Sequence, residues 1–502
     1  MVAERAARQP GKAQVLVASN RGPVAYSRGD DGELTARRGG GGLVSGLSAI
    51  GSDADALWVC AALNDADRAA VHAAGTGGRL SADDTGGQSV RMLDVPADTF
   101  ADAYNGVANS VLWFVHHMLY QTPLEPSFDA GFARQWAAYE RYNAAFADAL
   151  AEEAAEGARV LVQDYHLTLV PGLLRDRRPD LRIGHFSHTP WAPPDYYRLL
   201  PDRVAADVLR GVLGATRAGF LTRRWARAFA DCCARVLGAT VTADEATGEP
   251  QVVLDGRTTR LGVHGLGADA EFLRERAHRA DVQERMAQLR EQIGTAPDGR
   301  PRRTVVRVDR TELSKNIVRG LHAYRRLLDD RPEWREHVVH LAFAYPSRQD
   351  LAIYRDYTDE VSRVAEEINS AYGTAGWTPV VLHVRDDFAR SLAAYRMADV
   401  ALVNPIRDGM NLVAKEVPVV SDDGCALVLS REAGAFAEMA GAAIEVNPYD
   451  VSGTAGALHE ALTMERGERA ERTRRLAEAA TALPPARWFL DQLAALSATA
   501  PH

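Results

Sequence analysis

The chain has few cysteines, no long hydrophobic run and no apolar leader. Its 502 residues include four cysteines, Cys60, Cys232, Cys233 and Cys425, and none has the CxxC spacing of a zinc or redox site. No stretch reaches the ~18 uninterrupted apolar residues of a membrane helix, and residues 1–12 lack the hydrophobic core of a signal peptide. These absences predict a cytoplasmic protein with buried, free thiols.

The sequence also lacks an excess of basic charge. It has 58 Lys and Arg against 67 Asp and Glu, a formal net charge of −9, with the two signs interspersed. Proteins that bind nucleic acid carry a basic patch or stripe. Neither nucleic acid nor a membrane is therefore an expected partner, whereas the oligomeric state is undetermined and a homo-oligomer is compatible with the sequence. No internal repeat is present, and the Ala/Glu/Arg-rich stretches 141–158 and 464–482 are interpreted as solvated helices.

What is present indicates a two-domain α/β protein. The composition, 46% hydrophobic and 25% charged, is that of a globular chain, and 502 residues exceed a single core. Short β-rich runs alternate with helical periods, which predicts parallel sheets covered by helices on both faces. The predicted strands are residues 14–18, 159–163, 182–186, 304–308, 338–343, 380–383 and 400–403.

A glycine-rich segment, 262–267, separates the two halves of this pattern, which starts again at the strand near residue 304. The sequence therefore predicts an N-terminal domain over residues 1–265 and a C-terminal domain over 266–483. Prolines at 484 and 485 break the chain before a segment with helical apolar spacing at 487–496. Residues 484–502 are expected to form a final helix that packs back on the N-terminal domain.

The first strand is followed by Ser19-Asn20-Arg21-Gly22-Pro23 and then by glycines 39–42. Ligands of open parallel sheets bind at the carboxyl ends of the strands, where glycines let backbone N–H groups approach a phosphate. An anion-binding loop that includes Gly42 is the functional interpretation. A flexible surface loop is the alternative, because no GxGxxG or Walker pattern is present.

Two segments in the second half carry the residue types of a diphosphate site. Arg310 and Lys315 follow the 304–308 strand and could stabilise a leaving diphosphate without a metal, although loop cations are often only solvated. Residues 407–416, RDGMNLVAKE, follow the 400–403 strand. There Asp408 and Gly409 supply a turn before a helix N-terminus suited to phosphate, and Glu416 could accept ribose hydroxyls. A capped helix with a surface glutamate is the alternative.

Asp164 and His188 follow two further strands that are expected to be neighbours. At one sheet edge, an aspartate can hold a polyol hydroxyl and a histidine can act at a reacting centre. The alternatives are a helix N-cap for Asp164 and a structural role for His188. The spacing of His185 and His188 does not suit a metal pair, and no metal site is expected.

In this order, the motifs resemble the trehalose-6-phosphate synthase family of retaining GT-B glycosyltransferases over nearly the whole chain. The resemblance implies two Rossmann-like, doubly wound domains facing a central cleft, an N-terminal acceptor domain and a C-terminal nucleotide-donor domain. It also implies no cofactor, since the nucleotide-activated donor is a substrate. The segments that carry the resemblance are RDGMNLVAKE (407–416), QDYHL (163–167), SNR (19–21) with the later glycines, GWTP (376–379) and ANSVLW (108–113).

The same resemblance implies a role for each candidate residue. Asp164 and His188 would orient the reacting rings and stabilise charge, with Arg310 and Lys315 completing the catalytic set. The donor and its nucleotide would contact Gly42, Arg310, Lys315, Asp408, Gly409, Met410, Asn411, Leu412 and Glu416. The phosphate of the acceptor would be held by Arg21, Tyr104, Trp113 and Arg348.

The chain also departs from the family pattern. The family's LDYSKG loop reads TELSKN at 311–316, its GWSG segment reads CAAL at 60–63, and Asn404 replaces a threonine. These departures resemble the validoxylamine A 7'-phosphate synthase branch, whose members are pseudoglycosyltransferases. That branch implies GDP-valienol as donor and validamine 7-phosphate as acceptor, joined through nitrogen with retention and release of GDP. The alternatives are a trehalose-6-phosphate synthase, using a nucleotide-glucose and glucose 6-phosphate, and an inactive sugar-phosphate-binding regulator.

Overall fold

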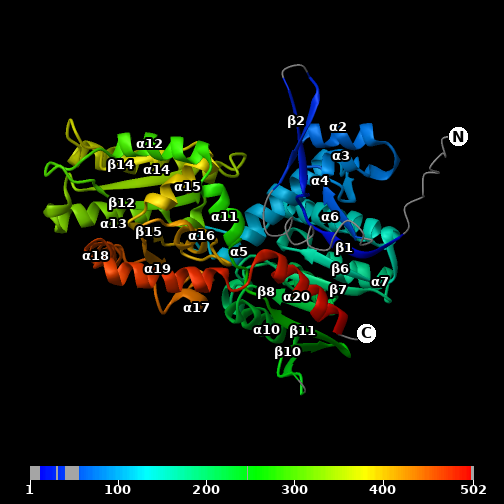
Figure 1. Ribbon diagram of the computed structural model, residues 1–502. Coiled ribbons are helices and arrows are strands. Elements are labelled where there is room, and N and C mark those ends of the chain that lie inside the picture. The colour runs from blue at the N-terminus through cyan, green and yellow to red at the C-terminus, as the bar shows by residue number, and fades with distance from the viewer. Residues whose placement is uncertain (1–11, 30–31, 40–55, 246, 499–502) are drawn as a thin grey trace. The chain divides into compact units, whose positions relative to one another are not determined.

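The structure, a computed structural model, describes residues 12–29, 32–39, 56–245 and 247–498 (Figure 1). The chain divides into two compact units, which we call the N-terminal unit (Met1–Gly265 with Pro485–His502) and the C-terminal unit (Leu266–Pro484). The division falls within the glycine-rich segment and at the proline pair. A Cβ at Gly267 would lie 2.5 Å from the Leu483 carbonyl oxygen, so the chain needs a glycine where these two segments meet.

The N-terminal unit is built on a sheet in which nine of the described strands follow the order β5-β4-β1-β6-β7-β8-β11-β10-β9. Neighbours from β5 to β11 are parallel, and the β11-β10-β9 edge is antiparallel. A separate hairpin pairs β2 with β3. The strands are β1 (Ala13–Ala18), β2 (Val24–Arg28), β3 (Leu34–Arg38), β4 (Ala56–Ala61), β5 (Val90–Leu93), β6 (Ala154–Gln163), β7 (Arg182–Ser187), β8 (Arg217–Phe220), β9 (Thr240–Ala243), β10 (Pro250–Leu254) and β11 (Arg257–Val263).

Helices cover both faces of this sheet (Figure 1). Several begin at a capping side chain: Asp129 before α6 and Thr222 before α10 accept the backbone N–H three residues on. The helical segments are α2 (Asp65–Ala74), η1 (Thr76–Gly78), α3 (Ala82–Thr85), α4 (Ala97–Ala101), η2 (Asp102–Leu112), α5 (Trp113–His117), α6 (Ala130–Glu153), η3 (Tyr165–Leu167), α7 (Val170–Arg177), α8 (Pro194–Tyr197), α9 (Asp202–Leu213), α10 (Arg223–Leu237) and α20 (Pro485–Ala498).

The last helix, α20, belongs to the N-terminal unit although it ends the chain. It contacts β6 and β7. Trp488 is 1% exposed, and its ring meets that of Phe186 edge to face at 4.9 Å. The apolar face that the sequence shows at 487–496 is thus buried against this sheet.

The C-terminal unit contains a parallel sheet in the order β14-β13-β12-β15-β16-β17. Its inner strands are mostly apolar, and all eight residues of β13 are buried, as expected for a sheet covered on both faces. The strands are β12 (Arg303–Arg310), β13 (Val338–Tyr345), β14 (Val380–His383), β15 (Val400–Val403), β16 (Ala426–Ser430) and β17 (Ile444–Val446). Its helical segments are α11 (Ala270–Ala277), α12 (Ala280–Ile293), η4 (Leu313–Lys315), α13 (Ile317–Asp330), η5 (Pro332–Trp334), α14 (Ala352–Tyr372), α15 (Phe388–Met397), α16 (Val413–Val420), α17 (Phe436–Met439), α18 (Val451–Thr463) and α19 (Arg466–Thr481).

The interpretation of 141–158 as a solvated helix is wrong in two respects. Helix α6 ends at Glu153, and the following residues already belong to β6. Tyr142, Phe146 and Leu150 are buried, so this part of α6 is a core helix and not a solvated one. The alanine-rich composition concealed both features, because alanine fits a buried helix face as well as an exposed one.

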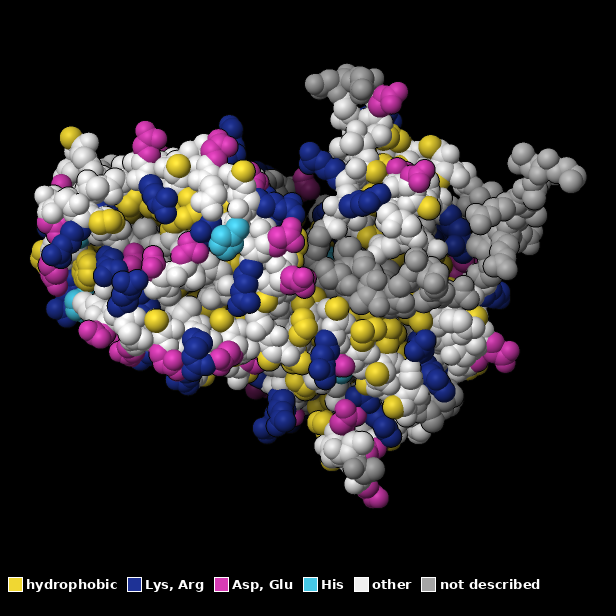
Figure 2. All heavy atoms as spheres, in the orientation of Figure 1, with side chains coloured by type: hydrophobic (Ala, Val, Ile, Leu, Met, Phe, Trp, Pro, Cys, Tyr) yellow, Lys and Arg dark blue, Asp and Glu magenta, His cyan; other side chains and the backbone are white. Residues whose placement is uncertain are grey.

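The cysteines and the surface charges agree with the expectations from the sequence. All four cysteines are free and buried. On the face drawn in Figure 2, acidic and basic side chains are intermixed. Within the part of the chain that the structure describes, no helix is long and apolar enough to span a membrane, and no group of three His, Cys, Asp or Glu residues could hold a metal ion.

Candidate active site

The strand order of the C-terminal unit defines where a ligand can bind. Counted from β12, the sheet runs 3-2-1-4-5-6, so chain connections diverge between β12 and β15. Crevices at such switch points, outside the carboxyl ends of the strands, bind nucleotides in open α/β sheets. The loop after β12 begins at Thr311 and the loop after β15 at Asn404. They touch directly, since the Ile406 N–H donates to the Ser314 carbonyl oxygen at 2.8 Å.

The two predicted cations both lie at this switch point, in different environments. Lys315 Nζ donates to Asp408 Oδ2 at 2.5 Å, which joins the β12 loop to the β15 loop. Arg310 ends β12 and is exposed, and among the described residues its side chain has no hydrogen-bond or ion-pair partner. A free guanidinium beside a fixed ammonium can bind a diphosphate and stabilise it as it leaves.

Asp408 organises the RDGMN loop. Its carboxylate accepts hydrogen bonds from the Met410 N–H at 3.3 Å and from Asn411 Nδ2 at 3.1 Å. Asn411 has φ 74° and caps the next turn by accepting the Ala414 N–H at 3.1 Å. Helix α16 therefore starts at Val413, two residues after Asn411. The capped-helix alternative describes Asn411 but does not explain the bond between Asp408 and Lys315.

Glu416 lies on α16 and is half-buried, with Tyr395 of α15 as its neighbour. Burial raises the pKa of Glu416 to about 6, and the Tyr395 hydroxyl acts weakly against that shift. The exposed surface glutamate of the alternative interpretation is thus wrong. The environment instead gives a carboxylate that ionises near neutral pH, as perturbed groups in binding sites often do.

This pKa predicts a pH dependence of nucleotide binding. A ribose hydroxyl donates more strongly to a carboxylate than to a carboxylic acid. Donor affinity should therefore be highest above pH 6 and fall as the pH is lowered through about 6, the pKa of free Glu416. Calorimetric titration of UDP-glucose or GDP-glucose from pH 5 to 8 tests this, because neither diphosphate ester ionises in that range. Glu416→Gln should bind weakly and without this pH dependence; a wild-type affinity that is flat across the range would exclude the ribose role.

Sequence reasoning missed charged residues beneath the loops. Arg307 is buried within β12, pairs with Asp309 at 2.8 Å and donates to the Lys315 carbonyl oxygen at 3.0 Å. Burial raises the pKa of Asp309, and the charge of Arg307 opposes that rise. Lys415 is fully buried and bonds to Glu438 at 2.6 Å and to the Leu266 carbonyl oxygen at 2.8 Å. Charged residues inside an apolar strand, as in TVVRVDR, are the signal that could have revealed the first pair.

Two of the departures from the family pattern contact each other. Asn316, at φ 60°, donates through Nδ2 to the carbonyl oxygens of Asn404 at 2.9 Å and Pro448 at 2.7 Å. Asn404 Nδ2 donates in return to the Asn316 carbonyl oxygen at 3.5 Å. Both side chains are buried. The two positions therefore form one contact at the switch point.

The N-terminal unit repeats the arrangement, with its switch point between β1 and β6. The loop after β1 carries Arg21, which is exposed and makes no side-chain hydrogen bond or ion pair within the described ranges. Beside it, Asn20 is buried and accepts the Tyr142 hydroxyl at 2.6 Å. Of the glycines that follow, Gly39 is described, whereas residues 40–42 lie outside the described ranges, so the predicted anion-binding loop stays a prediction.

Asp164 follows β6 in an unusual backbone conformation, φ 71° and ψ 175°. This region is almost restricted to glycine, and an L-residue there costs about 1–3 kcal/mol, which the surrounding structure must supply. Asp164 occupies the N-cap position of η3, as the alternative expects, but its side chain makes no capping hydrogen bond there. Its Oδ1 instead accepts the backbone N–H of His188 at 3.2 Å, which brings the two predicted residues together.

His188 is held as a neutral imidazole. Its Nε2 lies 2.9 Å from Gln163 Oε1, and the rings of Phe186 and Trp488 lie 4.8 and 5.5 Å away. These surroundings desolvate the ring and lower the pKa of His188 to about 4. With an amide oxygen as partner, Nε2 carries the proton and Nδ1 is left as an acceptor. A group of this kind orients a hydroxyl rather than supplying a proton.

The predicted acceptor residues are distributed over both units. In the N-terminal unit, Tyr104 stacks on His166 at 5.5 Å, and Trp113 lies 5.5 Å from the Tyr165 ring, so both line the Asp164 loop. Arg348 belongs to the C-terminal unit, in the loop between β13 and α14, and has φ 48°.

The CAAL segment closes the inner side of the β1 loop. A Cβ at Gly22 would lie 2.4 Å from Cys60 Sγ, so these positions pack directly together. Ala61 is 1% exposed and donates its N–H to the Asn20 carbonyl oxygen at 3.2 Å. A small side chain, Ala61, therefore stands beside the loop of Arg21.

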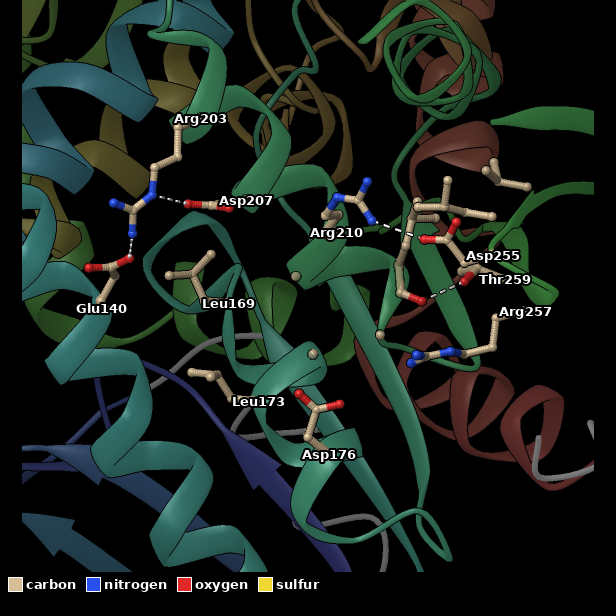
Figure 3. A pocket seen from close by; sticks show the side chains of 16 residues that line it. Glu140, Leu169, Leu173, Asp176, Arg203, Asp207, Arg210, Asp255, Arg257 and Thr259 are labelled. Atoms are coloured by element: carbon tan, nitrogen blue, oxygen red, sulfur yellow. Dashed lines mark hydrogen bonds and ion pairs between the residues drawn. The ribbon is translucent and has the colours of Figure 1, made fainter. Parts of the chain in front are cut away.

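A separate pocket of about 460 Å³ lies between α7, α9 and the β10–β11 hairpin (Figure 3). Its charged rim is largely paired, with Arg203 bonded to Glu140 and Asp207, and Arg210 bonded to Asp255. None of the predicted site residues lines it. The pocket adjoins the residues that precede β8 and the first residues of β11. These lie at the amino ends of the strands, whereas Asp164 and His188 follow the carboxyl ends of β6 and β7.

Comparison with known proteins agrees with this geometry. Residues 13–498 match the family described as Glycosyltransferase family 20. The chain is 35% identical over 498 residues to the trehalose-6-phosphate synthase of Mycobacterium avium, covering 96% of each chain. It is 34% identical over 465 residues to alpha,alpha-trehalose-phosphate synthase [UDP-forming] 1 of Aspergillus fumigatus, covering 91% of this chain and 85% of that protein.

Solved structures match at the level of the fold and of the sequence. One is described as trehalose-6-phosphate from E. coli bound with UDP-2-fluoro glucose; it is 27% identical, has a TM-score of 0.83, and the match covers 97% of this chain and 100% of that one. Another, the UDP-forming alpha,alpha-trehalose-phosphate synthase of Burkholderia xenovorans in complex with glucose-6-phosphate, is 26% identical with a TM-score of 0.80 and coverage of 96% and 100%.

Proposed function

Because the chain belongs to glycosyltransferase family 20 and shares the α/β GT-B fold of its solved relatives, we propose that it transfers a ring from a nucleotide-activated donor to a phosphorylated acceptor with retention. The C-terminal unit binds the donor and the N-terminal unit provides most of the acceptor site. The observation that carries this proposal is the pair of cations at the switch point, exposed Arg310 and Lys315 bound to Asp408.

The proposed chemistry needs no protein nucleophile. As the donor C–O bond breaks, the leaving diphosphate gains charge, which Arg310 and Lys315 stabilise. The acceptor attacks the face that the diphosphate leaves, and its proton passes to the departing phosphate oxygen. In this proposal the Asp164 carboxylate stabilises the cationic ring, and neutral His188 orients a ring hydroxyl through Nδ1; the support is the contact of Asp164 with the His188 N–H and of His188 Nε2 with Gln163. Positioning is thus the main contribution of the protein.

A nucleotide-glucose and glucose 6-phosphate are the first candidate substrates. The relatives named above are trehalose-phosphate synthases, two of them described as UDP-forming, and the solved relatives bind UDP-2-fluoro glucose and glucose-6-phosphate. The donor half of the site in this chain has the charged residues that such a donor requires.

GDP-valienol and validamine 7-phosphate are the second candidate pair, joined through nitrogen. The support is local: the linked Asn316 and Asn404, and small Ala61 beside the loop of Arg21, all stand where the family has other residues. A linked pair of substitutions at the donor switch point favours an altered donor over neutral drift. An unsaturated cyclitol also suits the same charge stabilisation, because its double bond spreads the positive charge as an allylic cation.

The test is nucleotide release from the purified protein with each pair in parallel: GDP-valienol with validamine 7-phosphate, and UDP- or GDP-glucose with glucose 6-phosphate. Turnover confined to the sugar pair makes the protein a trehalose-6-phosphate synthase. Turnover confined to the cyclitol pair makes it a pseudoglycosyltransferase. Binding of both ligands without release from either pair would support the inactive regulator instead.

Replacing Arg348 should act chiefly on the acceptor. Arg348→Ala removes a cation from the proposed phosphate site, so the acceptor KM should rise about tenfold or more, the scale of losing a charged hydrogen bond, while the donor KM changes little. Steady-state kinetics with each substrate varied in turn measures both constants. An effect confined to the donor KM would remove Arg348 from the acceptor site.

A further inference from the structure

A carboxylate that no proposed step uses lies inside the donor loop. Glu312 follows β12 and is 0% exposed, on the same short loop as Arg310 and Lys315. Burying an unpaired carboxylate costs several kcal/mol, so such a group persists only with partners that offset its lost hydration. The identity of those partners therefore indicates what Glu312 does.

The partners come from the segment between β13 and α14. Arg348 Nη1 donates to Glu312 Oε2, and the Tyr354 hydroxyl donates to Oε1 at 2.9 Å. The Arg348 guanidinium also lies over the Tyr354 ring, 5.5 Å from its centre. Glu312 and Tyr354 thus hold the Arg348 guanidinium from two sides.

The backbone of Arg348 adds to this arrangement. Its φ of 48° is uncommon for a residue with a side chain, and its side chain is only 10% exposed. A guanidinium has five N–H donors in a rigid fork, so one group can serve a carboxylate and a phosphate at once. A bond to Glu312 fixes the plane of the fork and hence the direction in which it meets a second anion.

We propose that Glu312 is a positioning residue for recognition of the acceptor phosphate, acting by holding Arg348. This inference rests on the proposed function, in which Arg348 binds that phosphate. Under this proposal the loop after β12 serves both substrates. Arg310 and Lys315 face the leaving diphosphate, while Glu312 orients the Arg348 guanidinium, which selects a phosphorylated acceptor.

The experiment compares binding of glucose 6-phosphate, validamine 7-phosphate and unphosphorylated glucose to the wild type and to Glu312→Gln by calorimetry, with acceptor and donor KM measured for the active pair. Glu312→Gln keeps the size of the side chain but loses its charge. We expect its affinity for the phosphorylated ligand to fall about tenfold or more, the scale of one charged hydrogen bond, with donor KM unchanged. Preference for the phosphorylated over the plain ligand should fall with it.

Three further variants separate positioning from stability. Tyr354→Phe removes the second bond to Glu312, together with the longer contact of the Tyr354 hydroxyl with Arg348 Nη1 at 3.4 Å, and should shift acceptor binding in the same direction by less. Glu312→Asp restores the carboxylate and should recover most of the affinity. Asp399→Asn is the matched control: Asp399 pairs with Arg303 at 2.6 Å and Arg469 at 3.1 Å, near the start of β15 and away from the switch point. It should lower the melting temperature without changing acceptor preference.

The outcomes are distinguishable. If the wild type binds a phosphorylated ligand and Glu312→Gln binds it equally well or more tightly, the inference is wrong while the proposed function stands. If the wild type binds neither phosphorylated ligand, the proposed function fails and the inference fails with it. A loss in Glu312→Gln that Asp399→Asn reproduces would mean only a general destabilisation, and would also overturn the inference.

Discussion

Arg310→Ala should reduce turnover about 100-fold or more, the usual scale for losing one donor that stabilises transition-state charge, and should leave the fold intact. The reason lies in the position of the side chain. Arg310 ends β12 at the switch point, exposed and unpaired within the described residues, so no folded-state contact is lost with it. Nucleotide release with the active substrate pair measures the effect, and thermal unfolding checks the fold.

Arg303→Ala is the matched control for this variant. Arg303 begins the same strand and pairs with Asp399 at 2.6 Å. This pair lies at the amino end of β12, whereas the switch point lies at its carboxyl end. Its loss should change turnover by less than about threefold, since an exposed ion pair contributes little. Near-normal turnover in Arg310→Ala would place the diphosphate elsewhere and remove the main support for the proposed function.

Asp164→Asn should also lower kcat about 100-fold, on the scale of a lost electrostatic contact to the transition state, whereas both substrates should bind with nearly unchanged affinity. Asparagine has the same shape, tolerates positive φ and can still accept the His188 N–H. The substitution therefore removes the negative charge and little else. Single-turnover kinetics, which isolates the chemical step, with calorimetry for each ligand, separates the two effects.

Asp180→Asn is the corresponding control in the N-terminal unit. Arg178 holds the pKa of Asp180 at about 2, and Asp180 also accepts the Gly157 N–H at 2.9 Å, at the opposite edge of the sheet from Asp164. Its substitution should cost stability above pH 4 and leave kcat alone. Should Asp164→Asn lose binding instead of rate, Asp164 would be a substrate-binding residue and not a source of charge stabilisation.

Much of the fold was readable from the sequence, because fully buried parallel strands are continuous apolar runs. All seven predicted strands are present. The predicted site residues follow five of them: β1, β6, β7, β12 and β15. The strands that escaped prediction, such as β8 (Arg217–Phe220) and β17 (Ile444–Val446), are short and carry charged residues or glycine, which weakens the pattern.

The sequence by itself determined the chemical type of each site residue and the strand that it follows, because residues close together in the chain lie in the same loop after a strand. The tertiary structure decided their partners and their charge states. Lys315 meets Asp408, 93 positions away, and Glu312 meets Arg348, 36 positions away. Burial sets the pKa of Glu416 to about 6 and that of His188 to about 4. Pairing and desolvation depend on which strands become neighbours in the sheet, and local spacing carries no information about that.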